Sequence, residues 1–344
     1  MEIEKKYFVV VRCFTYNHAA YITDALNGFC MQQTTFPFIC VIVDDASTDG
    51  EQDVIKAYLE NHFDLSKEAG FRQWETEDAF WTIARHGKNE NCLFVVSYLK
   101  KNLNRSDLKY KKLELIRPWE GDSKYIALCE GDDYWISPLK LQKQTDFLET
   151  HPDFTMCFHG SDVKNESDRE VMIHCDTIET REYFPADVFP EWVPHLSSFC
   201  FRSWINERFE MKHSEWLESG DTATVLKCMH LGRVWGMKEH MSVYRMNNFS
   251  SMSQPNNVKA IGRYVQHLKC FLLNFPKIDK EYCYMEICEY DYKRFKQNDG
   301  DRNRFYFLWD AIRTSPRYML KKEKQRVKVK LKSLLIKDLK KTYR

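Results

Sequence analysis

The chain has 344 residues, with 51 Lys and Arg against 50 Asp and Glu, so its formal net charge is only +1. Hydrophobic residues make up 43% of the sequence and aromatic residues 15%, which suffices for a buried core and argues against a disordered chain. A net charge near zero argues against a globally basic protein that binds nucleic acid. The longest apolar runs, such as 7–11 and 38–43, are as long as strands, well short of the roughly 20 residues of a membrane helix.

The first half of the chain alternates short β-branched runs with segments of helical periodicity. This order predicts right-handed β–α–β units around a parallel sheet, and therefore an α/β fold. The predicted strands are 7–12, 39–43, 93–98 and 125–129, and the predicted helices are 19–31 and 52–61.

The remaining segments are less regular. Residues 63–91, with Trp74 and Trp81, are interpreted as a long irregular insertion without an assigned function. Beyond residue 154 the pattern is mixed, and further strands are predicted at 197–202 and 241–245. From about residue 257 onward the pattern is typical of helices.

Twelve cysteines are present, and none forms a CxxC pair. Cys40, Cys129 and Cys200 lie inside apolar runs, as small hydrophobic residues do. The pattern predicts free, buried thiols and argues against a zinc site. Since residues 1–6 also lack an apolar signal-peptide core, we expect a cytoplasmic protein in a reducing compartment.

Three polar clusters directly follow predicted strands. They are 15–18 (TYNH) after the first strand, 44–50 (DDASTDG) after the second and 130–135 (EGDDYW) after the fourth. In parallel sheets, ligands bind beyond the carboxyl ends of the strands. We therefore expect these clusters to meet at one binding edge.

The acidic cluster Glu130-Gly131-Asp132-Asp133 is the most informative of the three. Two or three carboxylates on a turn at a strand end can bind a hard divalent cation, which prefers oxygen ligands. Such a cation can neutralise a diphosphate and stabilise it as a leaving group. The alternative is a solvated turn, because Gly-Asp-Asp is ordinary turn chemistry.

Asp44 and Asp45 repeat this arrangement after the second strand. A carboxylate here can accept hydrogen bonds from a base or a ribose, or the segment can simply cap the next helix. Tyr16 can stack on a base, or it can be an ordinary half-buried aromatic residue. No GxGxxG, GxxxxGK[ST] or GxSxG motif is present, which argues against a dehydrogenase, a P-loop protein and a nucleophile-elbow hydrolase.

Asp221 is a further acidic candidate. It stands just before an apolar periodic segment, 225–231, so it can act as a helix N-cap. Its carboxylate can also act as a general base that takes a proton from an acceptor hydroxyl.

The order of these segments resembles the inverting family-two glycosyltransferases. The resemblance covers about residues 5–255 and rests mainly on VDDASTDG at 43–50 and YIALCEGDDYW at 125–135. The segments HLSSFCFR, SGD and SVYRMNNFSSMS follow in the order of that family. The resemblance implies the GT-A fold, a Rossmann-like, mostly parallel sheet flanked by helices, here with a C-terminal helical extension.

This resemblance also implies a domain organisation. We expect a GT-A glycosyltransferase domain over 1–255, a helical extension over 256–316 and a basic tail over 317–344.

On the donor side, the resemblance implies that Tyr16 stacks near the nucleotide base and that Asp45 hydrogen-bonds this base, with Asp44 close by. Trp135 and the turn at 138–140 belong to the same motif and would shape the donor pocket.

For the chemistry, the resemblance implies that Asp132 and Asp133 hold Mn²⁺ or Mg²⁺ and the donor diphosphate, with Glu130 as a further carboxylate. Asp221 falls where the family places its catalytic base, and residues 195–198 would lie near the acceptor. The implied reaction moves a sugar from a nucleotide sugar, commonly UDP-linked in this family, to a hydroxyl of a glycan or lipid-linked glycan, with inversion. The implied setting is the assembly of bacterial surface polysaccharide.

Two departures from the family pattern motivate an alternative. Glu130 replaces the usual Asp, and Asn247 stands where many members carry a His that reaches the metal or the diphosphate. The alternative is a catalytically inactive GT-A-like module that binds a nucleotide sugar. A nucleotidyltransferase lacks support, because no Gly-rich loop with Lys or Arg follows the first strand.

The tail at 317–344 carries a strong local charge. It holds twelve Lys and Arg and two acidic residues, so its net charge is +10 and that of the remainder is −9. Apolar residues recur at helical spacing between Val327 and Leu339, which predicts a basic amphipathic helix that can lie on an anionic membrane surface. The alternatives are a helix docked on the acidic body and a solvated end.

Overall fold

The computed structural model describes residues 7–103, 109–165, 171–173, 178–189, 194–218, 220–246, 258–297 and 304–320. The chain packs as two compact units. The first comprises 1–210 and 224–250, and the second comprises 211–223 and 251–344.

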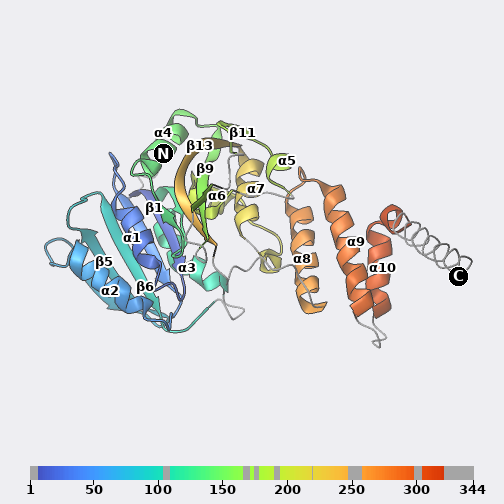
Figure 1. The fold of residues 1–344 in the computed structure, drawn as a ribbon, viewed down its shortest axis with the longest axis horizontal. Coiled ribbons are helices and arrows are strands. Elements are labelled where there is room, and N and C mark those ends of the chain that lie inside the picture. The colour runs from blue at the N-terminus through green and yellow to red at the C-terminus, as the bar shows by residue number, and fades with distance from the viewer. Residues whose placement is uncertain are drawn as a thin grey trace, which may run out of the picture. The chain divides into compact units, whose positions relative to one another are not determined.

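Four parallel strands form the centre of the first unit, in the order β7-β1-β2-β6. Their bounds are Tyr7–Thr15 (β1), Phe38–Asp44 (β2), Cys92–Leu99 (β6) and Ser123–Leu128 (β7). Of these four strands, β1 and β6 are labelled in Figure 1. Every residue of β2 is buried, as expected for a central strand covered on both faces. The four strands predicted from the apolar runs are therefore confirmed, with small shifts at their ends.

Mostly antiparallel strands extend this sheet on both sides, so that the described strands form one sheet of 13. On the side of β6 lie β5 (Ala79–His86), β3 (Phe63–Asp64) and β4 (Arg72–Glu75). On the side of β7 lie β12 (Cys200–Arg202), β9 (Phe154–Asn165), β13 (Arg233–Met246) and β11 (Arg181–Tyr183). Two short strands complete the sheet, β10 (Val171–Ile173) on β9 and β8 (Tyr134–Trp135) on β13.

The prediction of an irregular insertion over 63–91 is wrong. The segment forms β3, β4 and β5, and β5 pairs antiparallel with β6 along its whole length. The apolar pattern is weak here because all four residues of β4 are exposed. β4 is held by its pairing with β5, in which Trp74 lies directly opposite Trp81.

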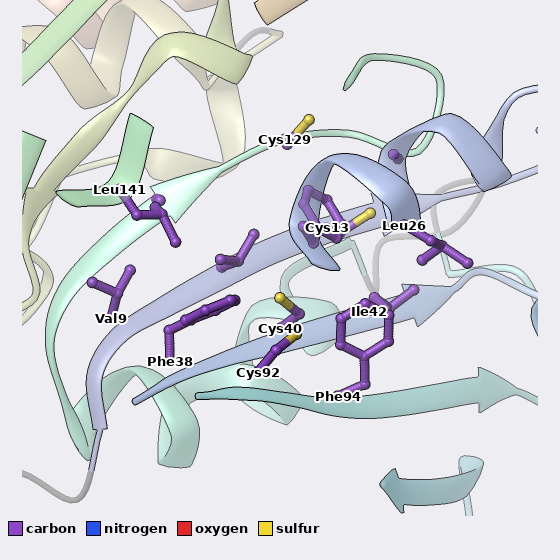
Figure 2. Close-up of a cluster of buried hydrophobic side chains, with 14 of the residues drawn as sticks. Val9, Cys13, Leu26, Phe38, Cys40, Ile42, Cys92, Phe94, Cys129 and Leu141 are labelled. Atoms are coloured by element: carbon purple, nitrogen blue, oxygen red, sulfur yellow. The ribbon is translucent and has the colours of Figure 1, made fainter. Parts of the chain in front are cut away.

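Helices pack on the sheet through alternate strand residues. Val9, Val11 and Cys13 of β1 belong to one apolar cluster together with side chains of α1, α2 and α4, part of which Figure 2 shows. The helices of the first unit include α1 (Ile22–Cys30), α2 (Glu51–His62), α3 (Lys109–Gly121), α4 (Lys140–Thr150), α5 (Pro185–Val188) and α6 (Trp204–Arg208). The 3-10 turn η1 (Leu196–Ser198) also belongs to the first unit; the 3-10 turn η2 (Ser214–Trp216) belongs to the second, and helix α7 (Asp221–Leu231) begins in the second and continues into the first.

The cysteines behave as small apolar residues. Figure 2 shows Cys13, Cys40, Cys92 and Cys129 among the apolar side chains of this cluster, and all four are fully buried. Across the described residues every cysteine is a free thiol, and all but Cys30 are buried. Burial raises the pKa of the Cys13 thiol, which keeps it neutral. The prediction of free, buried thiols is confirmed for these residues.

The second unit is helical, with α8 (Val258–Asn274), α9 (Lys280–Gln297) and α10 (Arg304–Thr314). Its apolar cluster contains Cys288, Tyr292, Ala311 and Met319. Among the helices in the described part of the chain, none has the length and apolarity needed to cross a membrane. Residues 321–344 of the basic tail lie outside the described residues.

Candidate active site

The carboxyl ends of the four central strands meet at one edge of the sheet. Thr15 at the end of β1 pairs with Asp44 at the end of β2, and Asp44 pairs with Tyr98 near the end of β6. On the other side of β1, the chain leaving β7 continues along the same strand, because Cys129 N donates to Arg12 O at 3.1 Å and Gly131 N donates to Phe14 O at 3.0 Å. The acidic turn that follows β7 is therefore set directly on the end of β1.

Gly131 makes this close approach possible. A Cβ at this position would lie 2.0 Å from Thr15 Oγ1 and 2.6 Å from Thr15 Cβ. No side chain fits in that space, so glycine lets the turn rest against Thr15 and places the carboxylates on either side of it.

The three carboxylates of the turn differ in exposure. Asp133 is 3% exposed, and its Oδ1 accepts a hydrogen bond from Arg245 N at 2.9 Å. Burial and the neighbouring charge of Asp132 raise the pKa of Asp133 well above its ordinary value. Asp132 and Glu130 are half-buried, and Asp132 Oδ2 lies 3.7 Å from His18 Nε2.

Arg245 on β13 holds this turn in place. Its Nη1 donates to Asp132 O at 2.8 Å, and its Nη2 pairs with Asp24 of α1. The guanidinium also lies over the ring of Tyr134, 4.4 Å from the centroid. Arg245 thus ties three separate segments together, as the bidentate geometry of a guanidinium allows.

Glu51, the first residue of α2, clamps the loops after β1 and β2 together. Its carboxylate is fully buried and accepts hydrogen bonds from the hydroxyl of Thr15, from His18 N at 2.9 Å and from Ser47 Oγ at 2.8 Å. Burial raises the pKa of Glu51, while these donors oppose the rise.

Asn17 adds a second set of bonds between the same loops. Asn17 N donates to Ser47 Oγ at 2.9 Å, and Thr48 N donates to Asn17 Oδ1 at 2.8 Å. Asn17 and Ala46 both take a positive φ, near +56° and +59°, so each loop has a tight left-handed bend. The two loops therefore form a rigid rim next to the acidic turn.

The two carboxylates after β2 are both buried but have different partners. Asp44 Oδ2 accepts from Gln52 Nε2 at 2.6 Å and from Ser47 N at 3.3 Å, so this residue links the loop after β2 to α2, while its buried Oδ1 has no hydrogen-bond partner among the described residues. Asp45 Oδ1 accepts from Leu103 N at 2.7 Å, and its Oδ2 accepts from Lys112 Nζ at 3.0 Å. Both carboxylate oxygens of Asp45 therefore have partners within the chain, one of them the ammonium group of Lys112. The predicted hydrogen bond from Asp45 to a nucleotide base stays a prediction.

Other predicted site residues lie in different surroundings. Tyr16 is half-buried in the loop after β1. Trp135 is 1% exposed and is a core residue: its Nε1 donates to Ser197 O at 2.9 Å, and its ring packs on Phe29 with centroids 5.0 Å apart. Trp135 therefore supports the acidic turn from the core, and its predicted role in shaping the donor pocket stays a prediction.

The turn at 138–140 and the segment 195–198 each combine buried and more exposed residues, and their predicted roles near the donor and the acceptor stay predictions. Lys140 is fully buried, with its Nζ 4.2 Å from the centre of the Trp135 ring and bonded to Gln144 Oε1 at 2.7 Å. Ser197 and Ser198 are buried, while His195 stacks on Tyr244 with ring centroids 4.3 Å apart.

Asp221 is the first residue of α7, in the short segment 211–223 of the second unit. Its assignment as the catalytic base stays a prediction. Asn247, the residue that departs from the family pattern, lies outside the described residues.

The donor set of the acidic turn fits a hard divalent cation. Glu130 and Asp132 are partly exposed carboxylates within one turn, and Mg²⁺ and Mn²⁺ prefer such oxygen ligands. Across the described residues, no three His, Cys, Asp or Glu side chains already converge as a metal site. The turn could thus supply part of the oxygen ligands of such a cation.

Several residues of the site carry no signal of their own in the sequence. Glu51, His18, Lys112 and Arg245 act through partners far along the chain; Arg245 and Asp132, for example, are 113 positions apart. A buried acid at the first turn of a helix, as in Asp49-Gly50-Glu51, is ordinary capping chemistry and does not point to a clamp.

Comparison with known proteins agrees with this geometry. Residues 12–70 match the family model described as glycosyl transferase family 2, a segment that includes the end of β1, the whole of β2 and both clamped loops. Crystal structures with the same architecture include S. aureus TarS 1–349 in complex with UDP-GlcNAc, with a TM-score of 0.53 and 15% identity over 89% of this chain and 79% of that one. The fold is that of a GT-A glycosyltransferase.

A second structural relative is the mannosyltransferase PcManGT from Pyrobaculum calidifontis, in complex with GDP-Man and Mn²⁺. It has a TM-score of 0.50 and 16% identity over 91% of this chain and 76% of that one. Together with the family match, these relatives support a glycosyltransferase, and the predicted GT-A fold is confirmed.

Relatives are also found by sequence among mycobacterial proteins. The uncharacterized proteins Mb1547 of Mycobacterium bovis and Rv1520 of Mycobacterium tuberculosis are each 35% identical over 148 residues. The match covers 42% of this chain and 32% of each relative, so it spans about a third of their length.

Proposed function

We propose that this protein is a metal-dependent, inverting glycosyltransferase that moves a sugar from a nucleotide sugar to a hydroxyl of a glycan or lipid-linked glycan. The observation that carries the proposal is the acidic turn Glu130–Asp133, set on the end of β1 beside the two clamped loops. The family match over these loops and the nucleotide-sugar ligands of TarS and PcManGT support it.

The donor side of this proposal is a UDP-sugar. The base lies between Tyr16 and Asp45 at the ends of β1 and β2, and the diphosphate extends toward Asp132. The rigid rim made by Glu51 and Asn17 supports this assignment, because it fixes the backbone on which a nucleoside would rest.

The diphosphate end requires charge neutralisation. Asp132, Asp133 and Glu130 would hold Mn²⁺ or Mg²⁺, which supplies positive charge to the departing diphosphate. Arg245 keeps the main chain of Asp132 in place, and His18 adds a hydrogen-bonding group next to Asp132 Oδ2.

Asp221 is the general base of this proposal. Its carboxylate takes the proton of the acceptor hydroxyl while the hydroxyl oxygen bonds to the anomeric carbon from the face opposite the diphosphate. The bond from that carbon to the diphosphate breaks in the same displacement, so the configuration inverts and no covalent enzyme intermediate forms.

The proposal is tested by following UDP release from UDP-GlcNAc and UDP-glucose with Mn²⁺, and by determining the anomeric configuration of the product by NMR. We expect activity that EDTA removes and excess Mn²⁺ restores. Asp221→Asn should lower kcat about 1000-fold, within the range of general-base catalysis, with little change in donor KM. Glu207→Gln, at an exposed acid of α6, is the matched control and should leave kcat unchanged.

Unchanged activity in EDTA, or in Asp221→Asn, would contradict the mechanism. Binding of the donors without any turnover would instead favour an inactive module that binds a nucleotide sugar.

The basic tail gives the proposed enzyme a place of action, the cytoplasmic face of a membrane where lipid-linked glycans of surface polysaccharide are assembled. Helix α10 precedes this tail and exposes Phe305, Tyr306 and Trp309, at 58%, 73% and 64%. Exposed aromatic residues next to Lys and Arg suit an anionic membrane interface. Flotation with anionic liposomes should recover the full chain but not a chain lacking 317–344, and equal recovery would overturn this part.

A further inference from the structure

A cavity of about 510 Å³ lies between α2, the β4–β5 hairpin and the end of β6. It contains none of the residues assigned to the donor or the cation, and it lies in the segment that the sequence leaves without a function. Its most distinctive feature is the share of aromatic side chains, which include Phe71, Trp74, Phe80, Trp81 and Tyr98.

Two of these side chains form a fixed platform. Trp74 and Trp81 lie opposite each other on β4 and β5, with ring centroids 5.7 Å apart and an interplanar angle of 4°. Trp81 is 5% exposed, and its Nε1 donates to Thr76 Oγ1 at 3.3 Å, so burial and this hydrogen bond fix the orientation of its ring. Trp74 is 39% exposed and therefore offers a ring to solvent that is already oriented.

A second exposed ring stands close by. Phe80 is 50% exposed, and Lys100 Nζ lies 5.0 Å from the centre of its ring. A single exposed apolar residue is ordinary on a protein surface. Here two large rings, those of Trp74 and Phe80, border the same cavity, whose lining also includes polar side chains.

The polar lining is mixed in character and nearly balanced in charge. Lys56 and Glu60 of α2 and Gln73 and Glu75 of β4 supply both donors and acceptors, and Glu75 pairs with Lys100 at 2.6 Å. Deeper in the cavity, the hydroxyl of Tyr98 is buried and has no hydrogen-bond partner among the described residues. A ligand hydroxyl would satisfy this group, whereas a phosphate would meet acidic side chains.

We propose that this cavity binds a neutral saccharide chain. A sugar ring has an apolar C–H face, which packs on an indole, and peripheral hydroxyls that donate and accept hydrogen bonds, as this lining does. Sites of this kind combine aromatic walls with a few placed polar groups. The volume is that of a pocket for a small ligand and not of a flat interface.

A second cavity next to the first gives room for more than one sugar of the proposed chain. It has a volume of about 810 Å³, adjoins the first and shares Phe71, Gln73 and Trp74 with it, while Trp119 of α3 lines its far side. Trp74 thus borders both hollows, and a chain of sugars can pass across it. The choice of a saccharide as the ligand rests in part on the proposed transfer function. The presence of the two cavities is independent of that function.

The test is a binding titration of the full chain, without donor or metal, against chitotetraose, cellotetraose and mannotetraose, followed by tryptophan fluorescence and saturation-transfer NMR. We expect millimolar to micromolar binding of at least one oligosaccharide. Trp74→Ala should weaken it at least tenfold, and Trp74→Phe should retain most of it. Trp309→Ala removes an exposed tryptophan of the second unit and is the matched control, with affinity unchanged.

Three results would overturn the proposal. They are no binding of any of the three oligosaccharides, equal affinity in Trp74→Ala, and a concentration-dependent dimer of the wild type that Trp74→Ala dissociates, which would mark the surface as an interface between copies. Phe80→Ala, at a half-exposed position, gives a second weakening variant if Trp74→Ala folds poorly. UDP-GlcNAc binding, measured in parallel by thermal shift, should be the same in every variant, so that failure of saccharide binding is separate from failure of the donor site.

Discussion

Two pairs of adjacent aspartates follow parallel strands of this protein, and their surroundings are opposite. After β2, Asp44 accepts hydrogen bonds from Gln52 and Ser47, and Asp45 pairs with Lys112, so both side chains meet donors of the chain itself. After β7, Asp132 and Asp133 stand next to each other and to Glu130, and the neighbouring charges raise the pKa of Asp133 further. In the first pair, Asp45 has a cation of the chain at 3.0 Å, whereas the carboxylates of the second pair repel each other.

An acidic pair at a strand end is therefore not in itself a metal site. Asp45 has a cation that the chain supplies, whereas we propose that the second pair takes one from solvent. Substitutions at the two turns should therefore affect different quantities.

The largest effect is expected at the second turn. Asp132→Asn keeps the shape of the side chain but removes a carboxylate that would hold the cation and diphosphate, so kcat/KM for the donor should fall about 1000-fold, or about 4 kcal/mol. The measurement is UDP release with saturating Mn²⁺. Asp53→Asn, at an exposed acid of α2, is the control and should behave as the wild type. Full activity in Asp132→Asn would remove the distinction between the turns.

At the first turn, the expected effect is on stability. Lys112→Met leaves the carboxylate of Asp45, which is 1% exposed, without its cation. Breaking a buried pair in this way should lower the free energy of unfolding by about 3 kcal/mol. Urea unfolding measures it, and Arg117→Met, at an exposed position on the same helix, should change little. An unchanged midpoint for Lys112→Met would mean that Asp45 does not need this neutralisation.

A smaller effect is expected from the close approach of the second turn to β1. Gly131→Ala places a Cβ 2.0 Å from Thr15 Oγ1, and the forced shift should destabilise the protein by about 2 kcal/mol. Gly121→Ala is the matched control, because its Cβ would meet no atom within 4 Å. Thermal unfolding compares the two, and equal melting temperatures would show that the turn can move away from β1.

The smallest effect concerns the pH dependence of Asp44. Burial raises the pKa of this carboxyl, so its contribution to stability is present below the ordinary pKa of an aspartate and is lost as the pH rises through the folded value. Asp44→Asn carries no charge at any pH and should therefore gain up to about 1 kcal/mol relative to the wild type at pH 7, but not at pH 4. Melting temperatures at the two pH values provide the test, and a gain that is the same at both would refute this account.

Sequence patterns predict the centre of this fold well, because its order is local. The strands around Val9, Cys40 and Tyr125 are apolar runs of the right length, and the turns after them are short and polar. The β4–β5 hairpin escapes prediction, because its strands carry exposed polar and aromatic residues and depend on pairing with each other.

The residues of the candidate site also differ in whether the sequence can predict them. Its carboxylates can be found from their place after strands, but their partners cannot. Lys112 lies 67 positions from Asp45, and Arg245 lies 221 positions from Asp24, so nothing local links them. Burial of Trp135 is likewise decided by packing against Phe29 and Ser197, not by its neighbours in the motif.

The buried thiols give this protein an internal reporter of its own motions. Cys13 lies on β1 and Cys40 on the neighbouring β2, while Cys129 directly follows β7 and precedes the acidic turn; all three are fully buried. A buried thiol reacts with an alkylating reagent only when its surroundings open. The rate at which each cysteine is labelled, read by mass spectrometry, would therefore show whether nucleotide binding at the edge above tightens the strands below, without any engineered probe.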